Sequence, residues 1–256
     1  MSLLKLEEVT KKFGGLTAVK NFSTELAPRE LCALIGPNGS GKTTIFNMIT
    51  GIYVPTQGKI SFNGKEITAK RPDIITGYGI ARTFQNIRLF QGLNVVENVM
   101  LGQHLHLHSN PVEATLNLPG YVREEKRMRL EGMRLLESLG MAQLAHDEPS
   151  ALPYGQQRKL EIARALATQP RLLLLDEPAA GMSPADSEEL MIFIRHILQT
   201  FDLSIFLIEH QMRVVMGICP RIIVIDQGEQ IAEGTPEEIQ NNNRVIEAYL
   251  GVADYA

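Results

Sequence analysis

Short, almost wholly apolar runs recur along the chain and are separated by segments with helical periodicity. Four of these runs occupy residues 31–35, 172–175, 205–208 and 222–225. Runs of this length without polar alternation are typical of parallel strands that are buried on both faces. Because helical segments separate the later runs, the pattern predicts an α/β core with a mainly parallel sheet.

The first third of the chain follows a different pattern. From Leu3 to Ile35 the apolar runs are short and alternate with polar residues, and residues 58–64 have the composition of a strand between two turns. Alternation with a period of two is typical of strands that bury one face only. We therefore expect an N-terminal antiparallel β element beside the parallel core.

The middle of the chain is rich in helix-forming sequence. Within residues 123–140, apolar side chains recur every three or four positions and so share one helix face, and Gly140 ends the pattern. The expected organisation is a single domain over residues 1–256, with an α/β core formed by residues 1–88 and 151–256 and an inserted helical subdomain at residues 89–150.

The end of the chain predicts a closing helix. Thr235 is a favourable N-cap residue, and Pro236 suits the first helical position. Glu237 and Glu238 in the first turn complement the positive end of the helix dipole. The helical pattern continues to Leu250.

Composition restricts the class of protein. The chain has 256 residues, of which 44% are apolar, and a formal net charge of −4, which supports a sizeable core and argues against nucleic acid as the main partner. No apolar run approaches the roughly 20 residues of a membrane span, and residues 1–8 lack the features of a signal peptide, so we expect a cytosolic location. Cys32 and Cys219 lack metal-ligand spacing and are interpreted as core residues.

One loop carries the strongest chemical signal. Three glycines, a lysine and a hydroxyl residue follow the first apolar run with the spacing of a phosphate-binding P-loop. Glycines let successive backbone N–H groups point inward, and the helix expected at residues 44–50 adds the positive end of its dipole. The residues assigned to nucleotide binding here are Gly36, Pro37, Asn38, Gly39, Ser40, Gly41, Lys42, Thr43 and Thr44.

ATP with Mg²⁺ is the expected ligand of this loop. Lys42 would reach the outer phosphates, and the Thr43 hydroxyl would occupy one position on Mg²⁺. The alternative is a chance glycine-rich turn. The strand expected before the loop and the helix expected after it favour the P-loop.

Two carboxylates follow the leucine run at residues 172–175. Asp176 is placed to hold Mg²⁺, and Glu177 is placed to accept a proton from the attacking water as a general base. The alternative is an ordinary acidic pair at the surface end of a strand. The position of Asp176 and Glu177 downstream of a P-loop favours the catalytic interpretation.

A third motif precedes the leucine run, and the helical residues 159–166 follow it. The motif consists of Leu152, Pro153, Tyr154, Gly155, Gln156, Gln157 and Arg158. Together with the P-loop and Asp176–Glu177–Pro178, it resembles the signature motif of the ABC ATPases, and the resemblance covers essentially the whole chain. This resemblance implies the ABC ATPase architecture: a P-loop NTPase core with a mainly parallel sheet, an N-terminal antiparallel β element and an inserted helical subdomain. It also implies that Tyr154, Gly155 and Gln156 cap the γ-phosphate of a nucleotide held by a partner subunit.

Three further positions match motifs of the same family. The resemblance implies that Gln85 contacts Mg²⁺ or the attacking water, that His210 bonds the γ-phosphate, and that Phe13 stacks on adenine. From the residues alone, a solvated glutamine, a structural histidine and an exposed phenylalanine at a strand end remain alternatives.

The chain departs from the family pattern at two places. Pro153 and Tyr154 stand where the family usually has Ser-Gly, so the usual serine contact to the γ-phosphate is not carried over. Ser183 stands where an aspartate is common, which leaves the usual contact across the dimer in doubt.

Alternating histidines at positions 104, 106 and 108 have the spacing of metal ligands on a strand. On a helix only His104 and His108 share a face, and no cysteine or carboxylate completes the set. We interpret them as a solvated helix end.

One nucleotide-binding set without an expected membrane span indicates the ATPase subunit of a transporter assembled from separate polypeptides. The resemblance implies a second ATPase subunit, which we expect to be non-identical, two integral-membrane permease subunits and, indirectly, a substrate-binding protein. The chain would then lie peripherally at the cytoplasmic face of the inner (plasma) membrane. ATP would favour a closed ATPase dimer, and hydrolysis would remove that preference.

The motifs are most similar to those of ATP-binding subunits of branched-chain amino acid importers. Urea importers and lipopolysaccharide exporters have similar ATPases and stay open as alternatives. A non-transport ABC ATPase of DNA repair or translation is a further class, but the sequence has neither a long coiled coil nor a second ATPase unit. A GTPase would need an Asn-Lys-x-Asp motif, which the sequence lacks.

Overall fold

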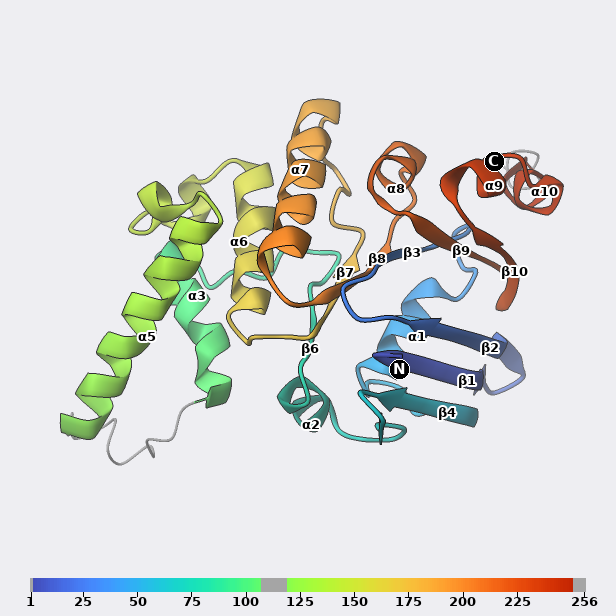
Figure 1. The fold of residues 1–256 in the computed structure, drawn as a ribbon, viewed down its shortest axis with the longest axis horizontal. Helices are drawn as coiled ribbons and strands as arrows, with labels where there is room; N and C mark the ends of the chain where they lie inside the picture. The colour runs from blue at the N-terminus through green and yellow to red at the C-terminus, as the bar shows by residue number, and fades with distance from the viewer. Residues whose placement is uncertain (1, 107–118, 251–256) are drawn as a thin grey trace. The chain divides into compact units, whose positions relative to one another are not determined.

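The structure, a computed structural model, describes residues 2–106 and 119–250 (Figure 1). Its contacts divide the chain into two compact units. The first unit combines the described residues up to Gln85 with Arg171–Gly181 and the described residues from Leu198 onward. The second contains the described residues of Asn86–Pro170 together with Met182–Ile197. Both β-sheets belong to the first unit, and the second is helical.

The N-terminal sheet is antiparallel, as the alternating pattern predicts. Its strand order is β2-β1-β4-β5. Side chains of β1 and β2 alternate in part between buried and exposed positions, and the pairing of the two strands has irregularities in register. The strands are β1 (Leu4–Phe13), β2 (Leu16–Leu26), β4 (Gln57–Phe62) and β5 (Lys65–Glu66).

The second sheet has six strands in the order β10-β9-β3-β8-β7-β6, and its pairs from β9 to β6 are parallel. Only β10 runs antiparallel to its neighbour. Every residue of β3, β7 and β8 is buried, which explains their uninterrupted apolar sequences. The strands are β3 (Leu31–Ile35), β6 (Ile80–Arg82), β7 (Leu172–Asp176), β8 (Ser204–Ile208), β9 (Arg221–Asp226) and β10 (Glu229–Gly234). The predicted parallel α/β core is confirmed.

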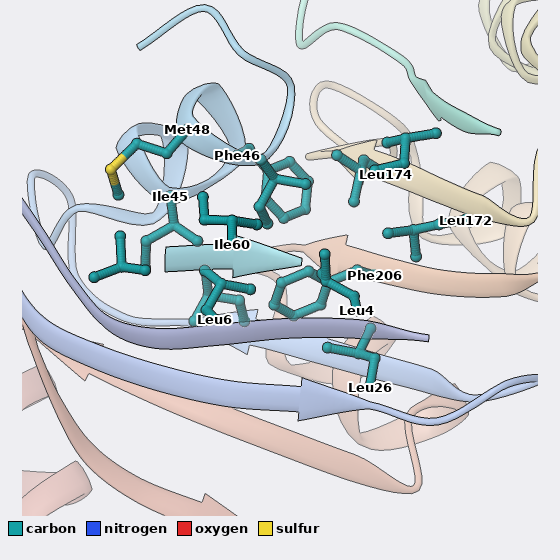
Figure 2. Close-up of a cluster of buried hydrophobic side chains, with 14 of the residues drawn as sticks. Leu4, Leu6, Leu26, Ile45, Phe46, Met48, Ile60, Leu172, Leu174 and Phe206 are labelled. Carbon is teal, nitrogen blue, oxygen red and sulfur yellow. The ribbon is translucent and has the colours of Figure 1, made fainter. Parts of the chain in front are cut away.

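Helix α1 (Lys42–Ile49) belongs to the core that joins the two sheets (Figure 2). The Phe46 ring of this helix lies 5.3 Å from the Phe206 ring of β8, measured between centroids. Because these apolar side chains anchor α1 beside β3, the loop between them is held at both ends. Figure 2 labels Leu4, Leu6, Leu26, Ile45, Phe46, Met48, Ile60, Leu172, Leu174 and Phe206 in this cluster.

The C-terminal segment forms two helices where the sequence predicts one. Thr235 caps the first of them with the expected capping box. The prediction of a continuous helix is wrong because Asn241 leaves helical geometry and the Asn242 side chain accepts the Arg244 backbone N–H at 3.0 Å, which starts a new helix. The remaining helices of the first unit are α2 (Pro72–Gly77), α8 (Met212–Ile218), α9 (Pro236–Gln240) and α10 (Asn243–Leu250).

The second unit packs α3 against both α5 and α6. Its helix α3 starts with a complete capping box between Asn94 and Glu97. A fully buried ion pair joins Arg158 and Glu161 on α6 at 2.7 Å. The unit contains the segment predicted as the helical subdomain, together with α6 and most of α7. Its elements are α3 (Val95–Gln103), η1 (His104–His106), α5 (Pro119–Ser138), η2 (Ala142–Leu144), η3 (Pro149–Ala151), α6 (Tyr154–Leu166) and α7 (Pro184–Thr200), of which the last three residues belong to the first unit.

Two other predictions concern membrane-spanning segments and the two cysteines. Within residues 2–106 and 119–250, none of the helices combines the length and apolar composition that a membrane-spanning segment requires. Cys32 and Cys219 are buried, free core residues, as predicted. Burial raises the pKa of the Cys32 thiol to about 12.

Candidate nucleotide-binding site

The predicted P-loop connects the end of β3 to the start of α1. Two of its glycines occupy positions where no side chain fits. A Cβ on Gly36 would lie 2.0 Å from the carbonyl oxygen of Ile225, and a Cβ on Gly41 would lie 2.6 Å from the carbonyl oxygen of Ala18. Both also have a positive φ, which disfavours other residues. The backbone is therefore packed tightly behind the loop.

Lys42 lies within the curve of this loop. Its Nζ atom donates to the carbonyl oxygens of Gly36 at 2.7 Å and Pro37 at 2.9 Å, and the residue is only 6% exposed. Burial lowers the pKa of the Lys42 ammonium, while the charges of Glu177 and Asp176 oppose that shift. The site thus holds a positive charge that main-chain carbonyls solvate only in part.

The N-terminus of α1 presents donors beside this lysine. Among the residues that the structure describes, no side chain caps the helix, and its first turn contains no acidic residue. Thr43 is exposed and Thr44 is half-buried. Within the described part of the chain, the buried Ser40 hydroxyl has no hydrogen-bond partner. Uncapped N–H groups, hydroxyls and a buried ammonium are the groups that bind a polyphosphate.

Asp176 ends β7 and is 4% exposed. Its Oδ2 atom lies 2.7 Å from Nη2 of Arg82, the last residue of β6. The other guanidinium nitrogen, Nη1, donates to Oδ1 of Asn47 on α1 at 2.7 Å. Arg82 therefore links the strand that carries Asp176 to the helix that follows the P-loop. Sequence reasoning assigned no role to Arg82.

Glu177 follows with a positive φ of 46°. Its backbone N–H donates to the Ile208 carbonyl at 2.9 Å, which continues the pairing of β7 with β8. The Gln85 amide nitrogen donates to Glu177 Oε2 at 3.0 Å, and His210 Nδ1 lies 3.5 Å from the same oxygen. The structure thus brings together the three residues that sequence reasoning assigned to hydrolysis.

Phe13 has an exposed ring at the end of β1. It is 40% exposed and packs edge to face against Tyr53, with centroids 5.1 Å apart. Lys11 Nζ lies 5.0 Å from the centre of the Phe13 ring and donates to the Val54 carbonyl at 2.8 Å. The contact with Tyr53 was not predicted from the sequence, because the two residues are distant along the chain and no motif contains both of them.

The signature-like residues begin α6 in the second unit. Tyr154 is 44% exposed, Gly155 and Gln156 follow it in the first turn, and Pro153 occupies the N-cap position without a side-chain bond. An uncapped helix N-terminus retains backbone donors for an anion.

Ser183 has a structural partner of its own in the second unit. Its hydroxyl donates to Asp186 Oδ2 at 2.7 Å, and the Asp186 backbone N–H donates to Ser183 Oγ at 3.2 Å. These bonds form a cap at the start of α7.

The alternating histidines lie in the second unit as far as the structure describes them. His104 and His106 belong to η1, and His108 lies outside the described residues. The described residues contain no cluster of metal-ligating side chains.

Comparison with known proteins agrees with this geometry. The model of the family described as "ABC transporter" matches residues 19–180. A second model, described as "Branched-chain amino acid ATP-binding cassette transporter", matches residues 229–255.

Curated relatives match over nearly the full chain. The high-affinity branched-chain amino acid transport ATP-binding protein BraF of Pseudomonas aeruginosa is 42% identical over 251 residues, which cover 98% of both chains. The corresponding LivG protein of Escherichia coli (strain K12) is 44% identical with the same coverage.

Solved structures match the fold as well. The ADP conformation of an ATP-binding cassette of an ABC transporter superposes with a TM-score of 0.86 at 30% identity, covering 98% of this chain and 99% of the other. A post-hydrolysis dimer of a cassette bound to ADP and Pi gives 0.74 at 26% identity, covering 91% and 98%.

A glycine loop between a buried parallel strand and a helix, beside a strand that ends in Asp176 and is followed by Glu177, defines a P-loop nucleotide-binding protein. The family match covers more than half of the chain, and the relatives match over 98% of it. The chain belongs to the ABC transporter family and is one of its ATPases. The resemblance inferred from the sequence motifs is confirmed.

Proposed function

We propose that this chain is the ATP-hydrolysing subunit of an importer for branched-chain amino acids. The arrangement of Gln85 and His210 around one carboxylate oxygen of Glu177 is the observation that carries the hydrolytic assignment. The C-terminal family match and the names of the relatives support the substrate class.

The P-loop binds the phosphates of ATP. Lys42 leaves its two carbonyl partners and forms charge-assisted hydrogen bonds with the outer phosphates, which are stronger than neutral ones. The N–H groups of the loop and of the first turn of α1 complete the site. Phe13 offers the exposed ring on which adenine stacks, and Tyr53 holds that ring in place.

The residues beside the P-loop fit Mg²⁺, which prefers oxygen ligands. Thr43 supplies a hydroxyl, Gln85 an amide oxygen and Asp176 a carboxylate. Because Arg82 bonds Oδ2 of Asp176, we assign the other oxygen to Mg²⁺ or its water. When bound, the ion neutralises charge on the phosphates.

Glu177 accepts a proton from the water that attacks the γ-phosphorus. The oxygen of that water forms a new bond to phosphorus as the bond to the β-phosphate oxygen breaks, which yields ADP and phosphate. Gln85 orients the water, and His210 donates to the γ-phosphate. Tyr154, Gly155 and Gln156 complete the corresponding site of a second ATPase subunit.

The proposed assembly contains a second, non-identical ATPase subunit and two permease subunits, and it receives substrate from a binding protein. The chain would then be peripheral at the cytoplasmic face of the membrane. A urea importer or a lipopolysaccharide exporter is the alternative that sequence reasoning left open. The match at residues 229–255 favours amino acid import over both.

The hydrolytic assignment is tested with Glu177→Gln, which keeps the shape of the side chain and removes the base. Turnover should fall by about 10²- to 10⁴-fold while ATP still binds. The exposed Glu66 provides the matched control, and Glu66→Gln should keep the parent rate. Equal turnover in Glu177→Gln and the parent would refute the role of Glu177.

The substrate assignment needs a separate experiment. The chain is reconstituted in vesicles with the second ATPase subunit, the permease pair and the binding protein of the proposed assembly, and uptake of labelled leucine is compared with uptake of labelled urea. ATP-dependent leucine uptake supports the proposal. Uptake of urea alone, or outward movement of lipid, overturns it.

A further inference from the structure

Glu209 is a buried carboxylate to which the sequence motifs assigned no role. It follows the last residue of β8, precedes His210 and is 0% exposed. Within the described part of the chain, no lysine or arginine lies within ion-pair distance of it. Burial raises the pKa of the Glu209 carboxyl, and bonds from backbone N–H groups oppose that shift. A buried carboxyl group without such a partner requires an explanation.

The hydrogen bonds of Glu209 join two segments that are distant in sequence. Its Oε1 atom accepts the Ala179 backbone N–H at 2.8 Å. Its Oε2 atom accepts the backbone N–H groups of His210 at 3.1 Å and Gln211 at 3.2 Å. One oxygen therefore holds the segment after Glu177, and the other holds the segment that carries His210.

A second bond connects the same two segments. The side-chain nitrogen of Gln211 donates to the Ala179 carbonyl at 2.7 Å. Both polar groups of the Ala179 backbone are thus bonded to residues adjacent to His210. Ala179 is itself fully buried, so water cannot replace these bonds without opening the structure.

We propose that Glu209 is a positioning residue for ATP hydrolysis: it fixes the segment after Glu177 to the segment of His210, and so sets the spacing between Glu177 and His210. This inference rests on the proposed roles of those two side chains. They lie 3.5 Å apart, and residues 177–179 and 209–211 contain all the anchors described above. A shift of either segment would carry the other with it.

Glu209→Gln separates the two anchors because an amide has only one oxygen. If that oxygen keeps the two bonds to His210 and Gln211, the amide nitrogen faces the Ala179 N–H, and two donors oppose each other. The reverse orientation loses two bonds, so the first is favoured. The variant should therefore release Ala179 while it retains the segment of His210.

The test measures kcat and KM for ATP and hydrogen exchange of the Ala179 amide in the assembled transporter. If the cost of one lost buried hydrogen bond falls on the transition state, the rate of hydrolysis decreases about ten- to a hundredfold. We therefore expect kcat of Glu209→Gln to fall by that factor, while KM stays within about twofold. The Ala179 amide should exchange faster. A kcat equal to that of the parent overturns the inference, and so does an unchanged Ala179 exchange rate.

Glu30→Gln is the matched control, because Glu30 also accepts a backbone N–H, from Ala27, and precedes β3 at the other end of the same sheet. It should leave kcat and Ala179 exchange unchanged even where stability falls. If Glu209→Gln does not fold, Gln211→Ala removes only the bond to the Ala179 carbonyl. It should lower kcat several-fold at constant KM, and an unchanged kcat would again overturn the inference.

Glu177→Gln distinguishes this inference from the proposed function. If Glu177→Gln lowers turnover and Glu209→Gln does not, only the inference about Glu209 fails. If Glu177→Gln turns over ATP at the parent rate, the assignment of the base fails, and the positioning role fails with it whatever Glu209→Gln does.

Discussion

Arg82 and Asp176 form a nearly buried ion pair, with Nη2 and Oδ2 2.7 Å apart and side chains that are 7% and 6% exposed. The same guanidinium donates to Asn47 and lies 5.7 Å from the centre of the Phe46 ring. Arg82 therefore compensates the charge of Asp176 and fixes it relative to α1. Under the proposed function, this bond fixes the orientation of the Asp176 carboxylate before Mg²⁺ binds.

Arg82→Ala should lower the free energy of unfolding by about 3 to 5 kcal/mol, because it leaves Asp176 as an uncompensated buried charge. Urea denaturation followed by circular dichroism measures this change. Arg82→Lys should recover part of the loss, since an ammonium restores the charge but not the two separate bonds to Asp176 and Asn47.

A double-mutant cycle assigns that loss to the pair. Arg82→Ala combined with Asp176→Ala should cost less than the sum of the single changes, because removal of both partners leaves no isolated charge. Arg71 forms an exposed pair with Asp73 and serves as the control, for which Arg71→Ala should change stability little. Strict additivity of the Arg82 and Asp176 variants would show that the ion pair contributes nothing.

Lys42→Ala should weaken ATP binding about ten- to a hundredfold, since a charge-assisted hydrogen bond contributes about 1.5 to 3 kcal/mol. Equilibrium titration with a fluorescent ATP analogue measures the affinity. Lys59 is exposed on β4 and provides the control, so Lys59→Ala should bind as the parent does. If Lys42→Ala also binds as tightly as the parent, the P-loop does not hold the phosphates through this lysine.

The lowered pKa of Lys42 adds a pH dependence to the same measurement. Under the proposed function, the phosphates of ATP bind the charged ammonium. A lowered pKa means that this ammonium loses its proton at a lower pH than an exposed lysine does. The affinity of the parent should therefore decrease as pH rises toward the usual lysine range. Lys42→Ala should lack that decrease, and a parallel decrease in both proteins would assign it to another group.

The sequence predicted the elements that the core requires. Runs such as residues 172–175 are apolar throughout because both faces of the strand are buried, and the P-loop is recognisable because close packing behind Gly36 excludes any side chain. Both constraints act on consecutive residues, so they are visible in the chain itself. The placement of Asp176 and Glu177 at the end of a buried strand follows from the same pattern.

Contacts between distant segments were not predictable in this way. Arg82 ends β6, a strand of only three residues without a recognisable pattern, and its partner Asp176 becomes its neighbour only through strand pairing. The sequence gives no sign that Glu209, beside His210, has a special role. Its bond to Ala179 joins the segment after β7 to the segment after β8. The break between α9 and α10 depends on how the Asn242 side chain competes for backbone donors, which periodicity does not report.

The last prediction concerns the partner subunit. In the proposed mechanism, the residues that begin α6 complete the site of a second ATPase, so an isolated chain binds nucleotide but lacks half of the catalytic cage. In this chain Pro153 and Tyr154 stand where the family usually has Ser-Gly, and the hydroxyl of Ser183 is bonded to Asp186. Two identical copies would repeat both departures in both sites. We therefore expect the natural mate to be a non-identical ATPase subunit.

The purified chain should accordingly be largely monomeric in size-exclusion chromatography with ATP and Mg²⁺, and its turnover should be slow. Addition of the second ATPase subunit with the permease pair should raise the rate at fixed ATP, and the loaded binding protein should raise it further. A stable dimer of the pure chain that hydrolyses ATP as fast as the full assembly would eliminate the hetero-pair. Such a result would leave the ATPase assignment intact, because that assignment depends on the P-loop, Asp176 and Glu177 within one chain.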